Sequence, residues 1–149
     1  MKKFFQLAGI AFLAFGCSSD DDSTVFIDPI QVSNTVTSGT WRITSFIEDG
    51  NDETNHFTGY DFTFNLNGEL TATNGTDTHA GSWDLTTENS NDDSPSGSDI
   101  DFEIMFAAPP EFTDLNEDWD ILQRTDTRLT LRHTSGGDGS IDHLVFDKN

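Results

Sequence analysis

Several residue types that would define a function are scarce in this chain. A single cysteine among 149 residues excludes an internal disulfide. Lysine and arginine number 7 against 27 aspartates and glutamates, which gives a formal net charge of −20. Such a field repels phosphate groups and anionic head groups, so we expect no nucleic-acid binding and no electrostatic attachment to membranes. The markedly apolar run over residues 4–15 is too short to cross a bilayer as a helix.

That apolar run belongs to a targeting segment. Two lysines precede it, which predicts a secretory signal peptide over residues 1–16. Cys17 follows directly, and its position resembles the lipobox of bacterial lipoproteins, with Ala14 and Phe15 standing where such boxes usually carry leucine and a small residue. The resemblance implies cleavage before Cys17, acylation of Cys17 and stable anchoring in the outer membrane. The alternative is an ordinary signal peptide followed by an unmodified cysteine.

An acidic run comes next, formed by Ser19, Asp20, Asp21 and Asp22. We interpret residues 17–38 as the lipid anchor and a flexible acidic tether, with at most a short apolar patch docking on the domain. The run is also similar to the acidic export signals that carry some lipoproteins through the outer membrane. That similarity implies a location at the cell surface rather than in the periplasmic leaflet.

Residues 39–149 have the pattern of one all-β domain. Apolar and polar residues alternate in short runs separated by Gly, Asn, Asp and Ser, which predicts strands over residues 39–47, 59–66, 69–73, 80–86, 99–106, 119–125, 128–134 and 141–147. Short connections between eight successive strands predict a small antiparallel up-and-down barrel, because closure removes exposed sheet edges. Two prolines interrupt the pattern, and a short helical turn is expected over residues 111–117.

The alternation also predicts which side chains point inward. In the first strand it selects Trp41, Ile43, Ser45 and Ile47, and in the second Tyr60, Phe62, Phe64 and Leu66. Asn67 and Gly68 follow as a hairpin signal, and a type I′ turn there requires a positive φ at both residues.

An opening Gly39-Thr40-Trp41 on the first of eight antiparallel strands resembles the lipocalin signature, and Gly81-Ser82-Trp83 repeats the Gly-x-Trp spacing. The resemblance covers residues 39–149 and extends to lipocalin-like domains of bacterial lipoproteins. It implies that Trp41 closes the barrel floor and that an arginine from a late strand packs across it. Arg124, Arg128 and Arg132 are the candidates, and we favour Arg128 or Arg132. A ligand site is then expected at the end opposite Trp41.

Inward-facing aromatic residues are the candidates for a ligand pocket: Tyr60, Phe62, Phe64, Trp83, Phe102, Phe106 and Trp119. A barrel of eight strands is just wide enough either to be filled by its side chains or to hold one small ligand. The same residues therefore fit a packed core or a lined pocket.

Catalytic and metal-binding patterns are weak. His56, His79, His133 and His143 lack ligand spacing, so we expect no zinc site. Asp101 and Glu103 resemble a glycosidase pair only in sharing a strand face, and that face is predicted to point outward. The acidic loops at 49–53 and 91–93 do not match the twelve-residue calcium loop. We expect neither a cofactor nor an enzymatic activity.

Two main functions remain as expectations, and an enzyme of unknown chemistry is a weaker third. The first is a surface-anchored, non-enzymatic lipoprotein that binds a small apolar or amphipathic molecule in or at the mouth of the barrel. The alternative is an accessory or structural module with a filled barrel whose acidic loops bind a protein or glycan partner. The oligomeric state is left open by the sequence.

Overall fold

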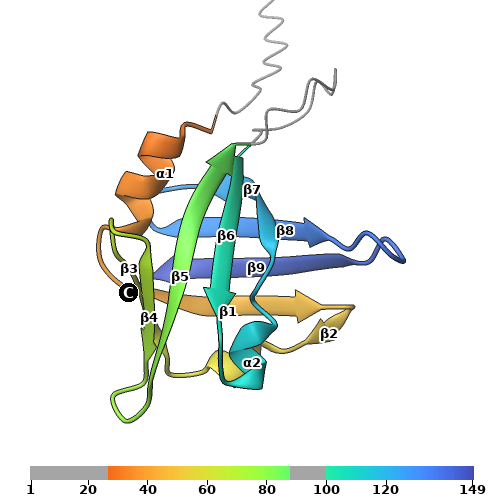
Figure 1. Cartoon of the computed structure of the whole chain (residues 1–149), viewed down its shortest axis with the longest axis horizontal. Helices are drawn as coiled ribbons and strands as arrows, with labels where there is room; N and C mark the ends of the chain where they lie inside the picture. Colours follow the sequence, from red (N-terminus) through yellow and green to blue (C-terminus); the bar gives the residue numbers. More distant parts are fainter. Residues whose placement is uncertain (1–26, 88–99) are drawn as a thin grey trace, which may run out of the picture.

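The computed structural model describes residues 27–87 and 100–149, which form a closed antiparallel barrel (Figure 1). The predicted signal peptide, Cys17, the acidic run and the loop at 91–93 lie outside the described residues. Eight strands follow one another in sequence order and close because the first pairs with the last. They are β1 (Trp41–Glu48), β3 (Asp61–Phe64), β4 (Glu69–Thr73), β5 (Thr78–Thr87), β6 (Ile100–Phe106), β7 (Asp118–Arg124), β8 (Arg128–Thr134) and β9 (Ile141–Lys148). The predicted fold class is confirmed.

The closure of the barrel is uneven on the two sides of β1. Strand β9 pairs with it from end to end, whereas β3 meets it only where Trp41 lies opposite Phe62. The two-residue β2 (Asn51–Asp52) and the 3₁₀ helix η1 (Thr54–Phe57) fill the remaining gap. The Phe46 amide donates to Thr54 Oγ1 at 2.8 Å, so a side chain takes the place of the missing strand partner.

A β-bulge changes the inward face of β1. The register with β9 shifts between Ile43 and Ser45, and the shift buries Phe46. Because a bulge inserts one extra residue, it exchanges the two faces of the strand beyond it. The prediction that Ser45 and Ile47 point inward is therefore wrong, since both are only partly buried.

Aromatic side chains fill the barrel interior. Phe62 contacts Phe106, Phe112 and Phe146 with ring centroids 6.5, 6.1 and 5.4 Å apart. Phe64 makes edge contacts with Phe102 and Phe146 at 5.6 Å to each. Ring edges against ring faces are the favourable arrangement for such groups, and their burial supplies most of the core's hydrophobic stabilisation.

Helix α1 (Pro29–Val36) covers one end of the barrel. Asp28 caps its N-terminus by accepting the Ile30 amide at 2.9 Å, and Pro29 occupies the first turn, where no amide hydrogen is needed. Val32 and Val36, four residues apart, are fully buried. The prediction of a flexible tether through residue 38 is wrong for this segment, because two valines on one face are enough to dock a helix that the barrel itself supports.

The other end is closed by α2 (Pro110–Thr113), which fits the predicted helical turn, together with η1. Phe57, Phe112 and Leu115 are buried there. Asn116 joins this cap to β6, because its side-chain amide donates to the Phe106 carbonyl at 2.8 Å and its oxygen accepts the Phe106 amide at 2.6 Å. Within the described residues no helix is long and apolar enough to span a membrane.

Candidate binding groove beside helix α1

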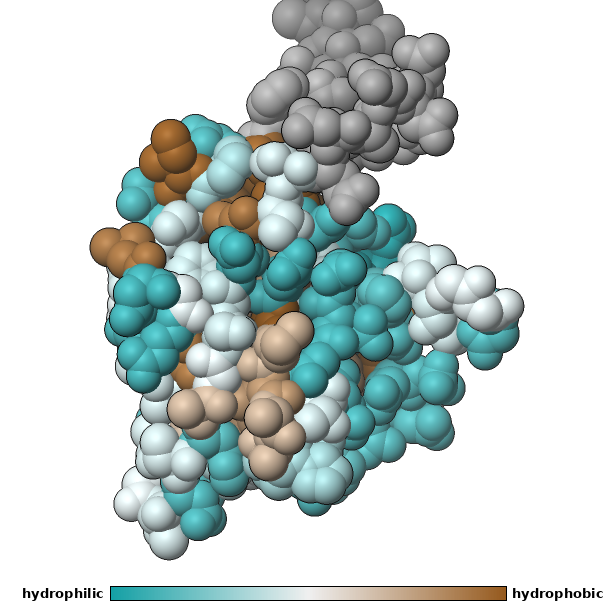
Figure 2. Space-filling view, viewed as in Figure 1, coloured by the Kyte–Doolittle hydropathy of each residue, from teal (hydrophilic) through white to brown (hydrophobic). Residues whose placement is uncertain are grey.

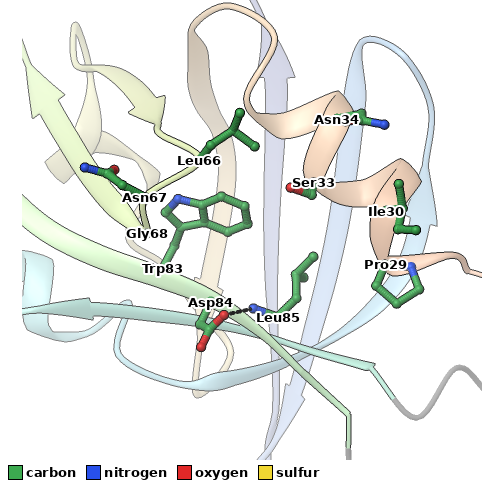
Figure 3. Close-up of a pocket in the computed structure, with 10 residues that line it drawn as sticks. All are labelled: Pro29, Ile30, Ser33, Asn34, Leu66, Asn67, Gly68, Trp83, Asp84 and Leu85. Carbon is green, nitrogen blue, oxygen red and sulfur yellow. Dashed lines mark hydrogen bonds between the residues drawn. The ribbon is translucent and has the colours of Figure 1, made fainter.

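A surface groove of about 500 Å³ lies at the α1 end of the barrel. Helix α1, the β3–β4 turn and β5 form its walls (Figure 3). Its lining residues come from those three segments: Pro29, Ile30, Ser33, Asn34, Leu66, Asn67, Gly68, Trp83, Asp84 and Leu85. The volume falls within the range of about 300–1,000 Å³ that ligand sites occupy.

Two exposed apolar side chains stand on the rims of this groove. Ile30 on α1 is 70% exposed and Leu66 in the β3–β4 turn is 78% exposed, the two highest fractions among the large apolar residues described. Figure 2 shows apolar side chains projecting from this side of the molecule. Large apolar groups left in water beside a hollow are typical of a surface that binds something.

Leu66 is exposed because β3 ends earlier than predicted. The Gly68 amide donates to the Asn65 carbonyl at 3.0 Å, which places Leu66 and Asn67 inside the turn. Gly68 has a φ of 84°, whereas Asn67 is not among the residues with positive φ. Both the inward position of Leu66 and the type I′ turn at Asn67 and Gly68 were wrong, because the turn begins two residues before the Asn-Gly signal.

Trp83 forms the rigid floor of the groove. Its indole Nε1 donates to the Asn65 carbonyl at 2.9 Å, and its ring stacks on Phe102 with centroids 5.7 Å apart. Only 7% of Trp83 is exposed. In Figure 3 the ring and the side chain of Leu85 point toward α1, and Ser33 points back toward the ring. Residues two apart on a strand share a face, so Asp84 points the other way.

The polar lining of the groove is almost entirely uncharged. Ser33, Asn34 and Asn67 supply a hydroxyl and two amides, and Asp84 is the one charged residue of the ten. The Asp84 Oδ1 atom accepts the Leu85 amide at 2.8 Å. An apolar floor and rims beside neutral polar groups suit an amphipathic molecule.

Other candidate pocket residues lie in the packed core. Phe62, Phe64, Phe102, Phe106 and Trp119 are at most 1% exposed and contact neighbouring side chains rather than a hollow. Of the predicted pocket residues, Trp83 alone lines the groove. The groove lies at the end that Trp41 occupies, whereas the opposite end, where the site was expected, is covered by α2 and η1.

Tyr60, the remaining candidate, is only partly buried and lies at the α2 end. Its hydroxyl is 3.3 Å from His79 Nε2, and Phe112 packs on both rings. None of the described hollows includes this pair.

Trp41 is fully buried under α1, as expected of a floor residue, and its Nε1 donates to the Val36 carbonyl at 2.8 Å. The cation above its ring is Lys148, whose Nζ lies 5.5 Å from the centroid. Arg128 and Arg132 point outward on β8, because that strand alternates Leu inward with Arg outward. The prediction that one of them packs on Trp41 is wrong.

The three arginines considered for that role have other partners. Arg128 forms a two-pronged pair with Asp147 at 2.7 and 2.9 Å, and Arg132 pairs with Asp120 at 2.9 Å. Hydrogen bonding to Arg128 holds the Asp147 pKa below its usual value. Arg124 donates to Thr35 Oγ1 and Gln31 Oε1, so it fastens α1 to β7.

Carboxylates line a second hollow, of about 380 Å³, on the outer face of β5, β6 and β7. Asp84, Glu103 and Asp118 lie directly opposite one another across these strands. Glu103 accepts the Thr86 hydroxyl at 3.1 Å. In the part of the chain that the structure describes, no three His, Cys, Asp or Glu residues are arranged to hold a metal ion.

Another acidic cluster lies at the β1–β2 turn and includes Asp49 of the loop weighed for calcium. Asp142 is buried, and its Oδ1 accepts the Asp49 amide at 2.8 Å. Burial, and then the charges of Asp114, Asp142 and Asp49, raise the pKa of Glu48. Two histidines each lie beside one carboxylate. His56 Nε2 is 3.4 Å from Glu53 Oε2, and His133 Nε2 is 3.3 Å from Glu117 Oε2.

The barrel is similar to that of a protein whose structure has been solved. No protein-family model matches the chain, and no curated protein matches it. A crystal structure of a DUF4847 family protein from Bacteroides vulgatus matches at 19% sequence identity, covering 79% of this chain and 97% of that one, with a TM-score of 0.49. A likeness at this level carries no argument about function.

Proposed function

We propose that this chain is a lipid-anchored, non-enzymatic, lipocalin-like module of the cell surface that binds a small apolar or amphipathic molecule. The groove beside α1 is the proposed site. The single observation that supports it most is the pair of apolar rims, Ile30 and Leu66, left exposed beside the Trp83 floor. Keeping both in water has a hydrophobic cost that a bound apolar group removes.

The groove is favoured over the barrel interior because the interior is occupied. Four phenylalanines inside the barrel form two ring contacts, Phe62 with Phe106 and Phe64 with Phe102. All four are almost wholly buried. A ligand inside would have to displace well-packed aromatic rings, which is costly. A ligand in the groove displaces only water.

The proposed anchor supports the same site. Ile27 lies ten positions after Cys17, and an extended chain of that length reaches at most about 35 Å. Helix α1 therefore stays near the bilayer if Cys17 is acylated, and α1 forms one wall of the groove. A molecule leaving or entering the membrane would meet this end of the barrel first.

Native mass spectrometry tests ligand binding. The full chain carrying Cys17→Ser, so that no attached acyl chain competes, is exposed to a total lipid extract and then to buffer alone. We expect a fraction of the protein to carry one added small molecule, and that fraction to fall in the Leu66→Asn variant. Protein that stays free of added mass under all conditions would remove the carrier proposal.

The anchor and the surface location have their own tests. Labelled fatty acid should be incorporated into the unaltered chain and not into Cys17→Ser. Replacing Asp20, Asp21 and Asp22 with alanine should protect the protein from protease added to intact cells. Continued labelling, or unchanged cleavage, would contradict the respective assignment.

A second candidate function is supported by the filled interior together with the acidic row of Asp84, Glu103 and Asp118. In that case the barrel is a structural platform that binds a protein or glycan partner through its acidic surface. Binding would weaken with salt and with Glu103→Gln, and Leu66→Asn would leave it unchanged. The opposite pattern would favour the groove.

A further inference from the structure

We propose that the groove beside α1 selects neutral and cationic single-chain amphiphiles and discriminates against fatty acids and other anionic ones. This inference rests on the proposed function and specifies its ligand. It is carried by the distribution of charge around the groove: apolar rims and floor, uncharged polar groups, one carboxylate, and cations that are engaged elsewhere.

The apolar part of the groove sets the place of the tail. Ile30 and Leu66 stand on opposite walls, and Trp83 and Leu85 lie between them on β5 (Figure 3). A single extended acyl or alkyl chain lying along this floor touches both rims. The groove's volume of about 500 Å³ suits one such chain rather than the two chains of a diacyl lipid.

The polar part of the groove sets the head group. Ser33 and Asn34 on α1 and Asn67 in the turn provide hydroxyl and amide groups, which can donate to and accept from the uncharged oxygens and nitrogens of a head group. Asp84 adds one negative charge at the edge of the groove, although its side chain leaves β5 on the face opposite Trp83 and Leu85. Among the ten described residues that line the groove, none is a lysine, arginine or histidine.

The cations nearest to α1 are held on its other side. Arg124 donates to Gln31 and Thr35 at 2.7 and 2.9 Å. Lys148 donates to Ser38 Oγ at 2.8 Å and lies over the Trp41 ring. Bringing either to the groove would break these contacts and leave α1 less firmly attached.

Two hollows beside α1 differ in whether a cation lines them. A smaller hollow also lies beside α1, with a volume of about 300 Å³. It is lined by Asn34, Thr35, Ser38, Asp126 and Lys148, so it contains a cation. The groove that Trp83 lines contains no cationic side chain among its described residues. A carboxylate head there would lose water without gaining a counter-ion, inside the field of a chain with net charge −20.

The experiment uses three probes with the same ten-carbon tail. They are 1-decanoylglycerol, decyltrimethylammonium and decanoate, each below its critical micelle concentration. The full chain carrying Cys17→Ser is titrated at pH 7.5 and about 0.15 M salt, with affinity from calorimetry and tryptophan fluorescence and stoichiometry from native mass spectrometry. We expect one neutral or cationic molecule per chain and binding of decanoate about tenfold weaker.

Two matched variants locate the site. Leu66→Asn removes a rim and should weaken 1-decanoylglycerol binding about tenfold. Met105→Asn is the control, because Met105 is also a large exposed residue, at 62%, and does not line the groove. It should leave the affinity unchanged. Both side chains are mostly in water, so neither change should unfold the barrel.

A third variant tests the charge. Asp84→Asn keeps an oxygen that can accept the Leu85 amide and removes only the negative charge. We expect decanoate to bind about two- to fivefold more tightly, decyltrimethylammonium to bind weaker by a similar factor, and 1-decanoylglycerol to be unchanged. An equal change for all three probes would show a structural effect and overturn the charge argument.

The outcomes separate this inference from the proposed function. If none of the three probes binds, both fall. If decanoate binds as tightly as 1-decanoylglycerol, the groove is a ligand site but the inference is wrong. If Met105→Asn weakens binding as much as Leu66→Asn, the site is elsewhere and both fall. Conversion of a dimer to a monomer by Leu66→Asn, without ligand, would show an interface between copies and overturn both.

Discussion

Two units share the Gly-x-Trp pattern, Gly39-Thr40-Trp41 and Gly81-Ser82-Trp83, but they have different structural roles. Both tryptophans donate their indole hydrogen to a backbone carbonyl, Trp41 to Val36 and Trp83 to Asn65. Trp41 thereby ties α1 to the barrel and is completely enclosed. Trp83 ties the β3–β4 turn to β5 and leaves an edge facing the groove. One unit closes the fold, and the other supports a surface.

The glycines differ as well. Gly39 has a φ of 102°, a conformation that side chains with a Cβ rarely adopt. Gly81 has no such φ, but a Cβ there would lie 2.5 Å from the Met105 carbonyl oxygen and 2.8 Å from the Phe106 ring. The first glycine is required by the backbone and the second by a neighbouring strand. A three-residue pattern therefore specifies neither role, and only the surroundings do.

Replacing Trp41 with alanine should give the largest effect. It empties a fully buried site and removes the hydrogen bond to Val36, so we expect a loss of about 3–5 kcal/mol in the free energy of unfolding. Urea denaturation measures the loss, and faster hydrogen exchange in α1 should accompany it. If α1 keeps its protection, the assignment of Trp41 as the attachment of α1 is wrong.

Gly81→Ala should come next, at about 1–3 kcal/mol, because the added methyl group has to displace backbone rather than a flexible side chain. Gly136→Ala is the matched control. A Cβ at Gly136 meets nothing within 4 Å and its φ is ordinary, so its change should stay within about 0.5 kcal/mol. Equal midpoints for the two variants in thermal denaturation would contradict the close packing of β5 on β6.

Gly39→Ala should cost less, about 1–2 kcal/mol, since the strain is in the backbone and the nearest atom, Lys148 Cε at 3.0 Å, can move aside. Gly39→Asn should be milder than Gly39→Ala, because asparagine tolerates positive φ better. Chemical denaturation of both variants checks the order. The reverse order would place the constraint in the contact with Lys148 rather than in φ.

Removing a charge should change the free energy of unfolding least, and the change should have opposite signs near the two Gly-x-Trp units. Beside Trp41, Asp147 has a pKa lowered by hydrogen bonding to Arg128, so its stabilising contribution is present above about pH 4 and is lost as pH falls through the lower, folded-state pKa. Asp147→Asn should therefore destabilise by about 0.2–1 kcal/mol at pH 7. The difference from the unaltered chain should vanish in strong acid, as followed by urea denaturation at several pH values.

Beside Trp83, by contrast, Glu103 lies opposite Asp84 and Asp118. Glu103→Gln relieves this repulsion and keeps an acceptor for the Thr86 hydroxyl, so it should stabilise by about 0.2–1 kcal/mol at pH 7. The same denaturation series measures it. Destabilisation by this change would mean that the acidic row contributes to the fold.

Strand β6 was predictable because Ile100, Phe102, Ile104 and Phe106 alternate without interruption, and all four are buried. The outward positions of Asp101, Glu103 and Met105 follow from the same pattern. Helix α1 was not predictable as a helix, since its only apolar signal on the buried face is Val32 and Val36, and it is stabilised by the barrel it covers.

The groove was missed for a related reason. Its rim residue Leu66 fits the alternation of β3 by sequence, and only the hydrogen bond from Gly68 to Asn65 shows that the strand has already ended. The bulge in β1 has no sequence signal either, because Phe46 and Ile47 are adjacent apolar residues and either satisfies the core. Both wrong predictions fall at positions where the sequence pattern is satisfied equally well by the predicted and by the observed arrangement.

The pairing of β1 with β9 has a consequence for how the chain folds. Thr44 and Asp147, joined by a 2.6 Å hydrogen bond across this seam, are 103 positions apart in the sequence. Contacts between such distant residues form slowly, because a long loop must close before they repay its entropy. During synthesis β1 waits for its main partner until the last eight strand residues have emerged. A truncation that removes only β9 would leave its two neighbours, β1 and β8, with unpaired edges and a tendency to aggregate.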